Sequence, residues 1–177
     1  GLARRIGVRV YLVGGVVRDI ILGVPNHDLD IVVEGNAIEF SQNLNRLLGG
    51  KVVSYPPFGT SVLFLKDQKR IDFATARKEF YRFPGAAPDV EYSNLKKDLF
   101  RRDFTLNAMA ISIYPDNWGE LFDFFGGLRD LRQKTLRVLH PLSFVDDPAR
   151  SIRAVRFEKK YNFHIEPFTM SLLKQTV

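Results

Sequence analysis

The chain has 177 residues, of which 45% are hydrophobic, and it carries a formal net charge of +6 at pH 7. This hydrophobic share is that of a packed globular protein and excludes wholesale disorder. Cysteine does not occur, which excludes disulfide bonds and thiolate metal sites, and without an apolar run of about 18 residues we expect no membrane partner and a cytoplasmic protein.

The first half of the chain alternates predicted strands and helices. Residues 8–13 are rich in valine and end at Gly14 and Gly15, which predicts a buried strand and a sharp turn. Residues 16–22 and 37–48 have apolar residues at helical spacing, and each segment stops at glycine. Further strands are predicted at residues 29–33, 52–53, 61–65 and 70–74. These elements predict an α+β core, in which a mixed sheet is backed by helices.

The second half is less regular. Between residues 75 and 95 the periodic pattern fails, and its prolines and glycine predict a long surface loop. Residues 99–111 return to helical or strand-like spacing. From Asp146 onward the chain is predicted to be helical, with a second helix over residues 168–177.

Two carboxylates, Asp28 and Asp30, mark the start of the second predicted strand. Alternate side chains of a strand share a face, so both point the same way while Leu29 points into the core. Each carboxylate disfavours ionisation of the other, and a divalent cation resolves that conflict. Mg²⁺ prefers one or two protein carboxylates together with water and phosphates. We therefore predict that Asp28 and Asp30 are catalytic and bind two Mg²⁺ ions. His27 beside them is predicted to be a turn residue.

The turn at Gly14 and Gly15 is a candidate phosphate site. Without Cβ atoms, its backbone N–H groups can approach phosphate oxygens, and the positive end of the following helix points the same way. Arg18, one turn inside that helix, either adds a charge to a bound triphosphate or pairs with Asp19. The sequence leaves both alternatives open.

A resemblance to a known family is carried by the run GGVVRD at residues 14–19 and the run DLD at residues 28–30. Together they resemble the signature of the polymerase-beta-type nucleotidyltransferases. More narrowly, they resemble the branch that holds bacterial poly(A) polymerases and bacterial-type (class II) tRNA nucleotidyltransferases, the CCA- or A-adding enzymes. The resemblance extends from about Val10 to Phe163 and implies a polymerase-beta-type nucleotidyltransferase head.

A second run, RRDFTLNAMA at residues 101–110, is similar to another signature of that family. In the family this segment holds the ribose and phosphates of the nucleotide and distinguishes ribose from deoxyribose. The resemblance implies these roles for Arg102 and Asp103, with Asn107 in support. Residues 121–131 resemble a further family segment, with Phe124 where proline is common.

The run DDPARSIR at residues 146–153 resembles the family's Glu-Asp-X-X-Arg motif, with Asp146 in place of glutamate. Residues three apart in a helix share a face, so Asp147 and Arg150 can present an acceptor and a forked donor to the edge of an incoming base. Arg153 and Arg156 follow on the predicted helix as further base-recognition residues. The alternative is an intrahelical ion pair worth about 0.3–0.5 kcal/mol.

Asp72 is a candidate third carboxylate, on a strand that is expected to lie beside the Asp28–Asp30 strand. It either assists deprotonation of a 3′ hydroxyl or pairs with Arg70 or Arg77, and the sequence does not separate the two.

The resemblance implies template-independent transfer of AMP and/or CMP, from ATP or CTP, to the 3′ end of tRNA. A poly(A) polymerase that adds 3′ A-tails and a non-catalytic nucleotide- or RNA-binding module remain as alternatives. Residues 1–138 are predicted to form the catalytic head, and residues 139–177 the beginning of a helical neck. Because the chain opens at Gly1 without methionine and stops just inside that neck, we expect a piece of a longer chain. The other expectation is that a second polypeptide supplies the rest of the tRNA-binding surface.

Overall fold

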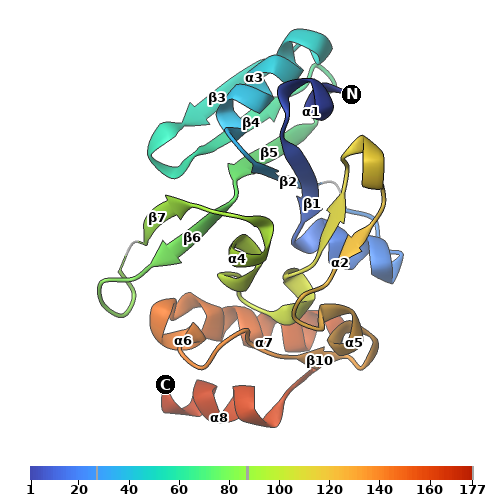
Figure 1. Cartoon of the computed structure of the whole chain (residues 1–177). Coiled ribbons are helices and arrows are strands. Elements are labelled where there is room, and N and C mark those ends of the chain that lie inside the picture. The colour runs from blue at the N-terminus through green and yellow to red at the C-terminus, as the bar shows by residue number, and fades with distance from the viewer. Residues whose placement is uncertain (27, 87, 177) are drawn as a thin grey trace.

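The computed structural model describes residues 1–26, 28–86 and 88–176 (Figure 1). His27, predicted to be a turn residue, lies outside the described residues, as do Ala87 of the predicted loop and Val177 of the last predicted helix. The elements are, in chain order, α1 (Leu2–Ile6), β1 (Arg9–Val13), α2 (Gly15–Leu22), β2 (Leu29–Glu34), α3 (Ala37–Leu48), β3 (Lys51–Tyr55), η1 (Pro56–Phe58), β4 (Thr60–Phe64), β5 (Arg70–Thr75), β6 (Arg77–Phe80), β7 (Asp89–Tyr92), α4 (Leu95–Phe100), η2 (Thr105–Asn107), β8 (Ala110–Ser112), η3 (Pro115–Asn117), β9 (Leu121–Phe122), α5 (Gly127–Arg132), β10 (Thr135–Leu136), α6 (Ser143–Asp146), α7 (Ala149–Tyr161), β11 (His164–Ile165) and α8 (Pro167–Gln175).

One mixed sheet of seven strands forms the centre of the molecule, in the order β3-β4-β5-β2-β1-β8-β9. Strands β2 and β5 pair in parallel, and the other neighbours in this sheet pair antiparallel. The strands and helices predicted for the first half of the chain all occur. The α+β class, with a mixed sheet backed by helices, is confirmed.

Helix α3 covers one face of this sheet. Phe40 of α3 packs against Ile31 of β2 and Phe73 of β5, with 6.0 Å between the ring centroids of the two phenylalanines. Because alternate residues of a strand point to opposite faces, Asp30 and Asp72 project from the other face. The sequence pattern of β2 and β5 thus places the carboxylates on the face opposite α3, where Val32 of β2 also packs in a further apolar cluster with Leu95 and Leu99.

A second apolar core joins the end of the sheet to the C-terminal helices. Val16 and Val17 of α2 pack in one cluster with Phe104, with Phe144 of α6 and with Ala154 of α7. Burial of these side chains stabilises the position of α7 beside the Gly14 turn. The cluster contains residues on both sides of the predicted boundary between residues 138 and 139, and the division into head and neck stays a prediction.

The prediction of a long loop over residues 75–95 was wrong. Strands β6 and β7 pair antiparallel as a hairpin (Figure 1). Ion pairs support it: Lys78 Nζ lies 2.8 Å from Glu91 Oε2, and Arg82 Nε lies 2.6 Å from Asp89 Oδ2. Neither strand buries a side chain fully, so no apolar alternation marks them in the sequence.

Residues 99–111 divide among the end of α4, η2 and β8 rather than forming one element. The two C-terminal helices occur as α7 and α8. None of the helices in the described part of the chain combines the length and the apolar character that crossing a membrane requires.

Candidate active site

The turn between β1 and α2 brings the backbone close to two charged side chains. Gly14 has φ 74°, a left-handed conformation that glycine adopts without a Cβ clash. A Cβ at this position would lie 3.0 Å from Arg102 Nη1 and 3.7 Å from Asp30 Oδ2. The turn therefore requires glycine both for its backbone angle and for the space that Arg102 occupies.

Three carboxylates lie along the adjoining edge of β2 and β5. Asp30 is in β2 and is paired in register with Asp72 of β5, and Asp28 is exposed just before β2 begins. Burial raises the pKa of the Asp30 carboxyl, Arg102 opposes that rise, and the negative charges of Asp72 and Asp28 add to it. Asp72 also accepts a hydrogen bond of 2.7 Å from Arg70 Nε. The position of Asp72 is thus compatible both with assisting deprotonation of a 3′ hydroxyl and with pairing to Arg70.

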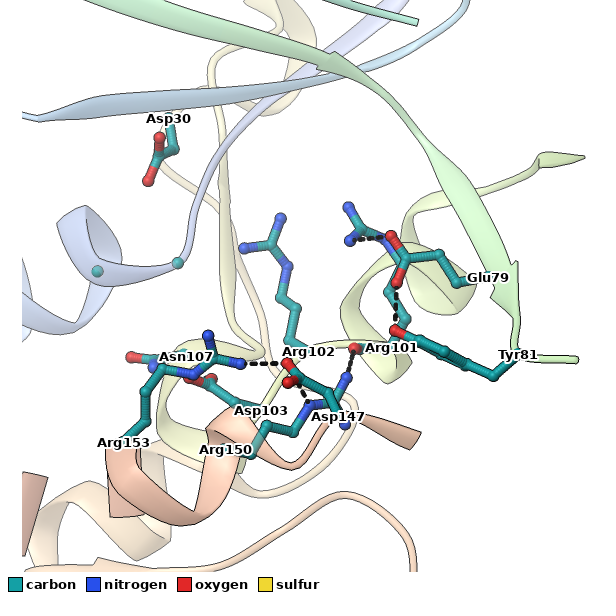
Figure 2. A pocket seen from close by; sticks show the side chains of 12 residues that line it. Asp30, Glu79, Tyr81, Arg101, Arg102, Asp103, Asn107, Asp147, Arg150 and Arg153 are labelled. Atoms are coloured by element: carbon teal, nitrogen blue, oxygen red, sulfur yellow. Dashed lines mark hydrogen bonds and ion pairs between the residues drawn. The ribbon is translucent and has the colours of Figure 1, made fainter. Parts of the chain in front are cut away.

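A cavity of about 290 Å³ extends from one of these carboxylates, Asp30, to a group of arginines, whereas Asp28 and Asp72 do not line it (Figure 2). In Figure 2, Asp30 lies at one side of this first cavity and Asp147, Arg150 and Arg153 lie at the other, with Arg102 between. The lining residues are Gly14, Gly15, Asp30, Glu79, Tyr81, Arg101, Arg102, Asp103, Asn107, Asp147, Arg150 and Arg153.

Asp98, a fully buried carboxylate of α4, holds two of the arginines. Arg101 Nη2 donates to Asp98 Oδ1 at 2.8 Å, and Arg102 Nη2 donates to Asp98 Oδ2 at 3.0 Å. Burial raises the pKa of Asp98, but the guanidinium groups of Arg102 and Arg101 lower it more, so its pKa lies below the ordinary value. The pair of arginines is therefore fixed at the cavity by one ionised carboxylate.

Asp103 and Asn107 form a small polar network behind the Gly14 turn. Asn107 Nδ2 donates to Asp103 Oδ1 at 3.0 Å, and Arg18 Nη1 donates to Asn107 Oδ1 at 2.7 Å. Arg18 also pairs with Asp19, 2.7 Å away, and its guanidinium lies over the ring of Tyr161. The structure thus brings Asp103 and Asn107 to the cavity but places Arg18 behind it, paired with Asp19.

The predicted helical pair of Asp147 and Arg150 is arranged differently from the prediction. Asp147 precedes α7 in an extended conformation, as the C-cap of α6, because Pro148 and Ala149 begin the next helix. The two side chains still meet: Arg150 Nε lies 3.6 Å from Asp147 Oδ2, and Arg153 Nη2 donates to the same oxygen at 2.6 Å. Arg156 is not brought to this cavity; it is exposed and lines another one beside Arg18.

The β6–β7 hairpin contributes residues that sequence reasoning missed. Glu79 accepts hydrogen bonds from Arg101 Nη1 at 2.9 Å and from the hydroxyl of Tyr81 at 2.9 Å. Burial, followed by the charge of Glu79, raises the pKa of Tyr81 to about 12. Arg77, Glu79 and Tyr81 are spaced two residues apart, as residues on one face of a strand are. This spacing of polar residues is the signal by which the sequence could have indicated a strand here.

The donors and acceptors of the site fit an anion bound through divalent cations. Among the described residues, the buried Nε atoms of Arg102, Arg150 and Arg153 make no hydrogen bond. Those of Arg150 and Arg153 still lie 3.6 Å from Asp147 Oδ2 and 3.4 Å from Asp103 Oδ2, so the Nε of Arg102 is the donor that best suits an anionic ligand. No group of three or more acidic or histidine side chains in the described ranges is arranged to enclose a metal ion. Asp28 and Asp30 instead offer the one or two carboxylates with which Mg²⁺ binds when substrate phosphates complete its shell.

Comparison with known proteins gives a consistent result. The A-adding tRNA nucleotidyltransferase of Aquifex aeolicus is 55% identical over 170 residues, which cover 96% of this chain and 20% of that protein. A solved CCA-adding enzyme, apo form II, superposes with a TM-score of 0.95 at 56% identity over 99% of this chain and 42% of the other. A tRNA nucleotidyltransferase complexed with a primer tRNA and an incoming ATP analog superposes with a TM-score of 0.89 at 50% identity, covering 99% of this chain and 48% of the other.

The chain thus spans between about a fifth and about half of the length of these proteins, by the coverage of 20%, 42% and 48%. The model of the Poly A polymerase head domain matches residues 10–137. That match includes the Gly14 turn, the three carboxylates, and Arg101 and Arg102, which directly follow α4. The chain belongs to the family defined by the Poly A polymerase head domain.

Proposed function

We propose that this chain is the catalytic head of a tRNA nucleotidyltransferase that transfers AMP and/or CMP from ATP or CTP to the 3′ end of tRNA, in the cytoplasm. The observation that carries the proposal is the first cavity, where the Gly14–Gly15 turn and Asp30 lie at one side, Asp147 and Arg150 at the other, and Arg102 between them. The solved relative with a primer tRNA and an incoming ATP analog supports these two substrate classes.

The reaction proposed is in-line attack by the 3′ oxygen of the RNA on the α-phosphorus of the nucleotide. A bond forms from that oxygen to phosphorus, the bond to the oxygen bridging to the β-phosphate breaks, and pyrophosphate leaves. Mg²⁺ bound at Asp28 and Asp30 would neutralise the negative charge of the phosphates and activate the attacking oxygen. Arg102 and the backbone N–H groups of the Gly14 turn hold the triphosphate.

The other cavity residues divide between ribose and base. We assign ribose contacts to Asp103 and Asn107, whose mutual hydrogen bond fixes their orientation. Asp147 and Arg150 are assigned to the base, with Arg153 positioning Asp147. Arg150 Nη1 donates to Ser143 Oγ and its Nη2 to the backbone oxygen of Arg101, each at 2.7 Å.

Arg18 is assigned the second of the two roles that the sequence left open, pairing with Asp19, whereas Arg156 is assigned a role different from the predicted one. Arg18 is assigned to support of Asn107 instead of a direct phosphate contact, because its guanidinium is buried against Asp19. Arg156 lies outside the cavity and is assigned no base contact. Asp72 remains the proposed third carboxylate, opposite Asp30.

Incorporation of labelled ATP and CTP, measured separately, into tRNAs that lack all or part of the terminal CCA tests the proposal. Mg²⁺ and the downstream helical region of a relative are supplied. Addition limited to the missing positions establishes the activity and shows which nucleotides are added. Long A-tails reassign the protein to a poly(A) polymerase, and absence of incorporation with all components present leaves a binding module.

We expect Gly14→Ala to weaken ATP binding about tenfold, because the new Cβ displaces the Arg102 guanidinium, which is 3.0 Å away, and a charge-assisted hydrogen bond is worth about 1.5–3 kcal/mol. The measurement is the Kd of ATP with Mg²⁺ by calorimetry.

Gly7→Ala is the matched control for this change. Gly7 has nearly the same backbone angle, φ 78°, but a Cβ there meets nothing within 4 Å. Gly14→Ala should lose more stability than Gly7→Ala, because Gly7 has ψ 29°, in the left-handed helical region that costs alanine about 1–2 kcal/mol, whereas Gly14 has ψ −137°, close to a region that only glycine adopts readily. The comparison between the two variants is therefore made on ATP affinity of the folded proteins. If the two variants bound ATP with equal affinity, the position of the Arg102 guanidinium would not depend on the absence of a Cβ at Gly14.

A further inference from the structure

A second cavity adjoins the first on the face of the sheet opposite α3. Its volume is about 440 Å³, within the range of about 300–1,000 Å³ that is usual for ligand pockets. Asp30 and Arg102 line both cavities. Of these two cavities, Asp72 lines only the second, so the proposed third carboxylate faces the second cavity and not the first.

Strand register explains how this second cavity is built. Asp30 of β2 pairs with Asp72 of β5, which pairs with Val62 of β4, so these three form one row across the sheet. In the next row, Ala74 of β5 pairs with Thr60 of β4, and Thr60 pairs with Tyr55 of β3. Residues of the two rows share a face. The result is a floor of small side chains, Thr60, Val62 and Ala74, between the carboxylates and Tyr55.

Tyr55 is an exposed aromatic side chain at the far end of this floor. It is 50% exposed although it lines the cavity. Strand β3 lies two strand spacings from β5, or about 10 Å, since neighbouring strands lie about 4.8 Å apart. Tyr55 is also one row, or about 7 Å, along the strands from Asp72, so their backbone positions are about 12 Å apart and their side chains approach a ligand from its two ends. One nucleoside, with its base at Tyr55 and its sugar at Asp72, spans such a distance.

We infer that the second cavity binds the 3′-terminal nucleoside of the RNA strand, with its base stacked on Tyr55 and its 3′ hydroxyl directed at Asp30 and Asp72. The inference rests on the proposed function, which needs two substrates at one set of carboxylates. The first cavity is rich in arginine and suits the triphosphate. In the described part of the chain, Arg102 is the single cation lining the second cavity, which suits an uncharged sugar and base on an aromatic side chain.

The test compares wild type, Tyr55→Ala and Tyr55→Phe in binding a fluorescent single-stranded oligoribonucleotide that ends in CC. Base stacking on an aromatic side chain predicts that Tyr55→Ala raises the Kd of the RNA about tenfold, while Tyr55→Phe keeps it within about twofold. The Kd of ATP should not change. Trp118→Ala is the control for loss of an exposed aromatic side chain, since Trp118 is 73% exposed and does not line this cavity.

Photocrosslinking locates the RNA end directly. The same oligonucleotide with 5-iodocytidine at its 3′ terminus should crosslink to Tyr55, identified by mass spectrometry of the digested protein. A crosslink confined to other segments, or an RNA Kd that Tyr55→Ala leaves unchanged, overturns the inference.

The two proposals fail separately. If the wild type incorporates nucleotides but Tyr55→Ala keeps the primer KM, only the subsite is wrong. If the wild type incorporates nothing yet crosslinks at Tyr55 and loses RNA affinity in Tyr55→Ala, the subsite stands and the catalytic proposal fails.

Discussion

Asp30→Asn should reduce nucleotide incorporation about 10³-fold or more, while the protein stays folded. Among the residues that the structure describes, Asp30 is the one carboxylate that lines both the arginine-rich cavity and the second cavity, so it contacts the reaction centre in the proposed mechanism. Loss of a group that stabilises transition-state charge costs about 10²–10³-fold for a single neutral donor, and a carboxylate that holds the cations should cost at least as much. Single-turnover incorporation at saturating ATP, CTP and Mg²⁺ measures the effect.

The stability of the same variant should move in the opposite direction. Burial and the neighbouring charges of Asp72 and Asp28 raise the pKa of Asp30, which means that the folded protein disfavours its ionised form. A neutral asparagine removes this penalty, so the thermal midpoint without Mg²⁺ should rise.

Asp67→Asn serves as the control, because Asp67 is exposed and pairs with Lys69 in the turn between β4 and β5. It should leave incorporation unchanged. An Asp30→Asn protein that keeps a tenth of wild-type incorporation, or that unfolds, would remove Asp30 from the proposed reaction centre.

The parts of the site that the sequence predicts are those whose partners are close in the chain. The Gly14 turn follows from a valine-rich strand that ends in two glycines. The shared face of Asp28 and Asp30 stays a prediction from strand periodicity, because β2 begins only at Leu29 and Asp28 lines neither cavity. Such local patterns need no knowledge of the remaining fold.

The parts that sequence reasoning missed depend on contacts between distant segments. Arg18 is directed at Asn107, 89 positions away, instead of at the cavity. Glu79 reaches the cavity only because the β6–β7 hairpin lies beside α4, where it meets Arg101. A charged side chain has many possible partners in a sequence of 26 basic and 20 acidic residues, so composition and spacing do not select among them.

Asp98 is the residue whose importance the sequence hides most completely, and Asp98→Asn should destabilise the fold by about 3 kcal/mol. Its side chain is 0% exposed and accepts hydrogen bonds from Arg101 and Arg102. Removing one partner of a buried ion pair typically costs about 3–5 kcal/mol. Here Arg102 would lose its carboxylate partner, whereas Arg101 would keep Glu79, so we expect the lower end of that range. The free energy of unfolding, from urea titration, measures the loss.

The pH dependence of this loss follows from the direction of the pKa shift. The folded protein lowers the pKa of Asp98 below the ordinary value of 3.8, so the contribution of Asp98 to stability is fully present above that value. The contribution is lost as the pH falls through the lower pKa of the folded state. The stability difference between wild type and Asp98→Asn should therefore be constant near neutral pH and shrink below about pH 3.8.

Asp89→Asn is the matched control, because Asp89 makes an equally short ion pair with Arg82, 2.6 Å long, on the exposed hairpin. Its stability should change little, since water screens that pair. A similar loss of unfolding free energy in both variants would mean that the burial of Asp98 does not make its ion pairs more stabilising than an exposed one.

Asp98→Asn should also weaken ATP binding about tenfold under conditions where the variant is folded, because Arg102 loses the carboxylate that directs it toward Gly14 and the cavity. Asp98 does not line the cavity, so its effect on ATP can only pass through the arginines it holds. If the folded variant bound ATP as tightly as the wild type, Arg102 would keep its position without Asp98. The ion pairs of α4 would then stabilise the fold without organising the site.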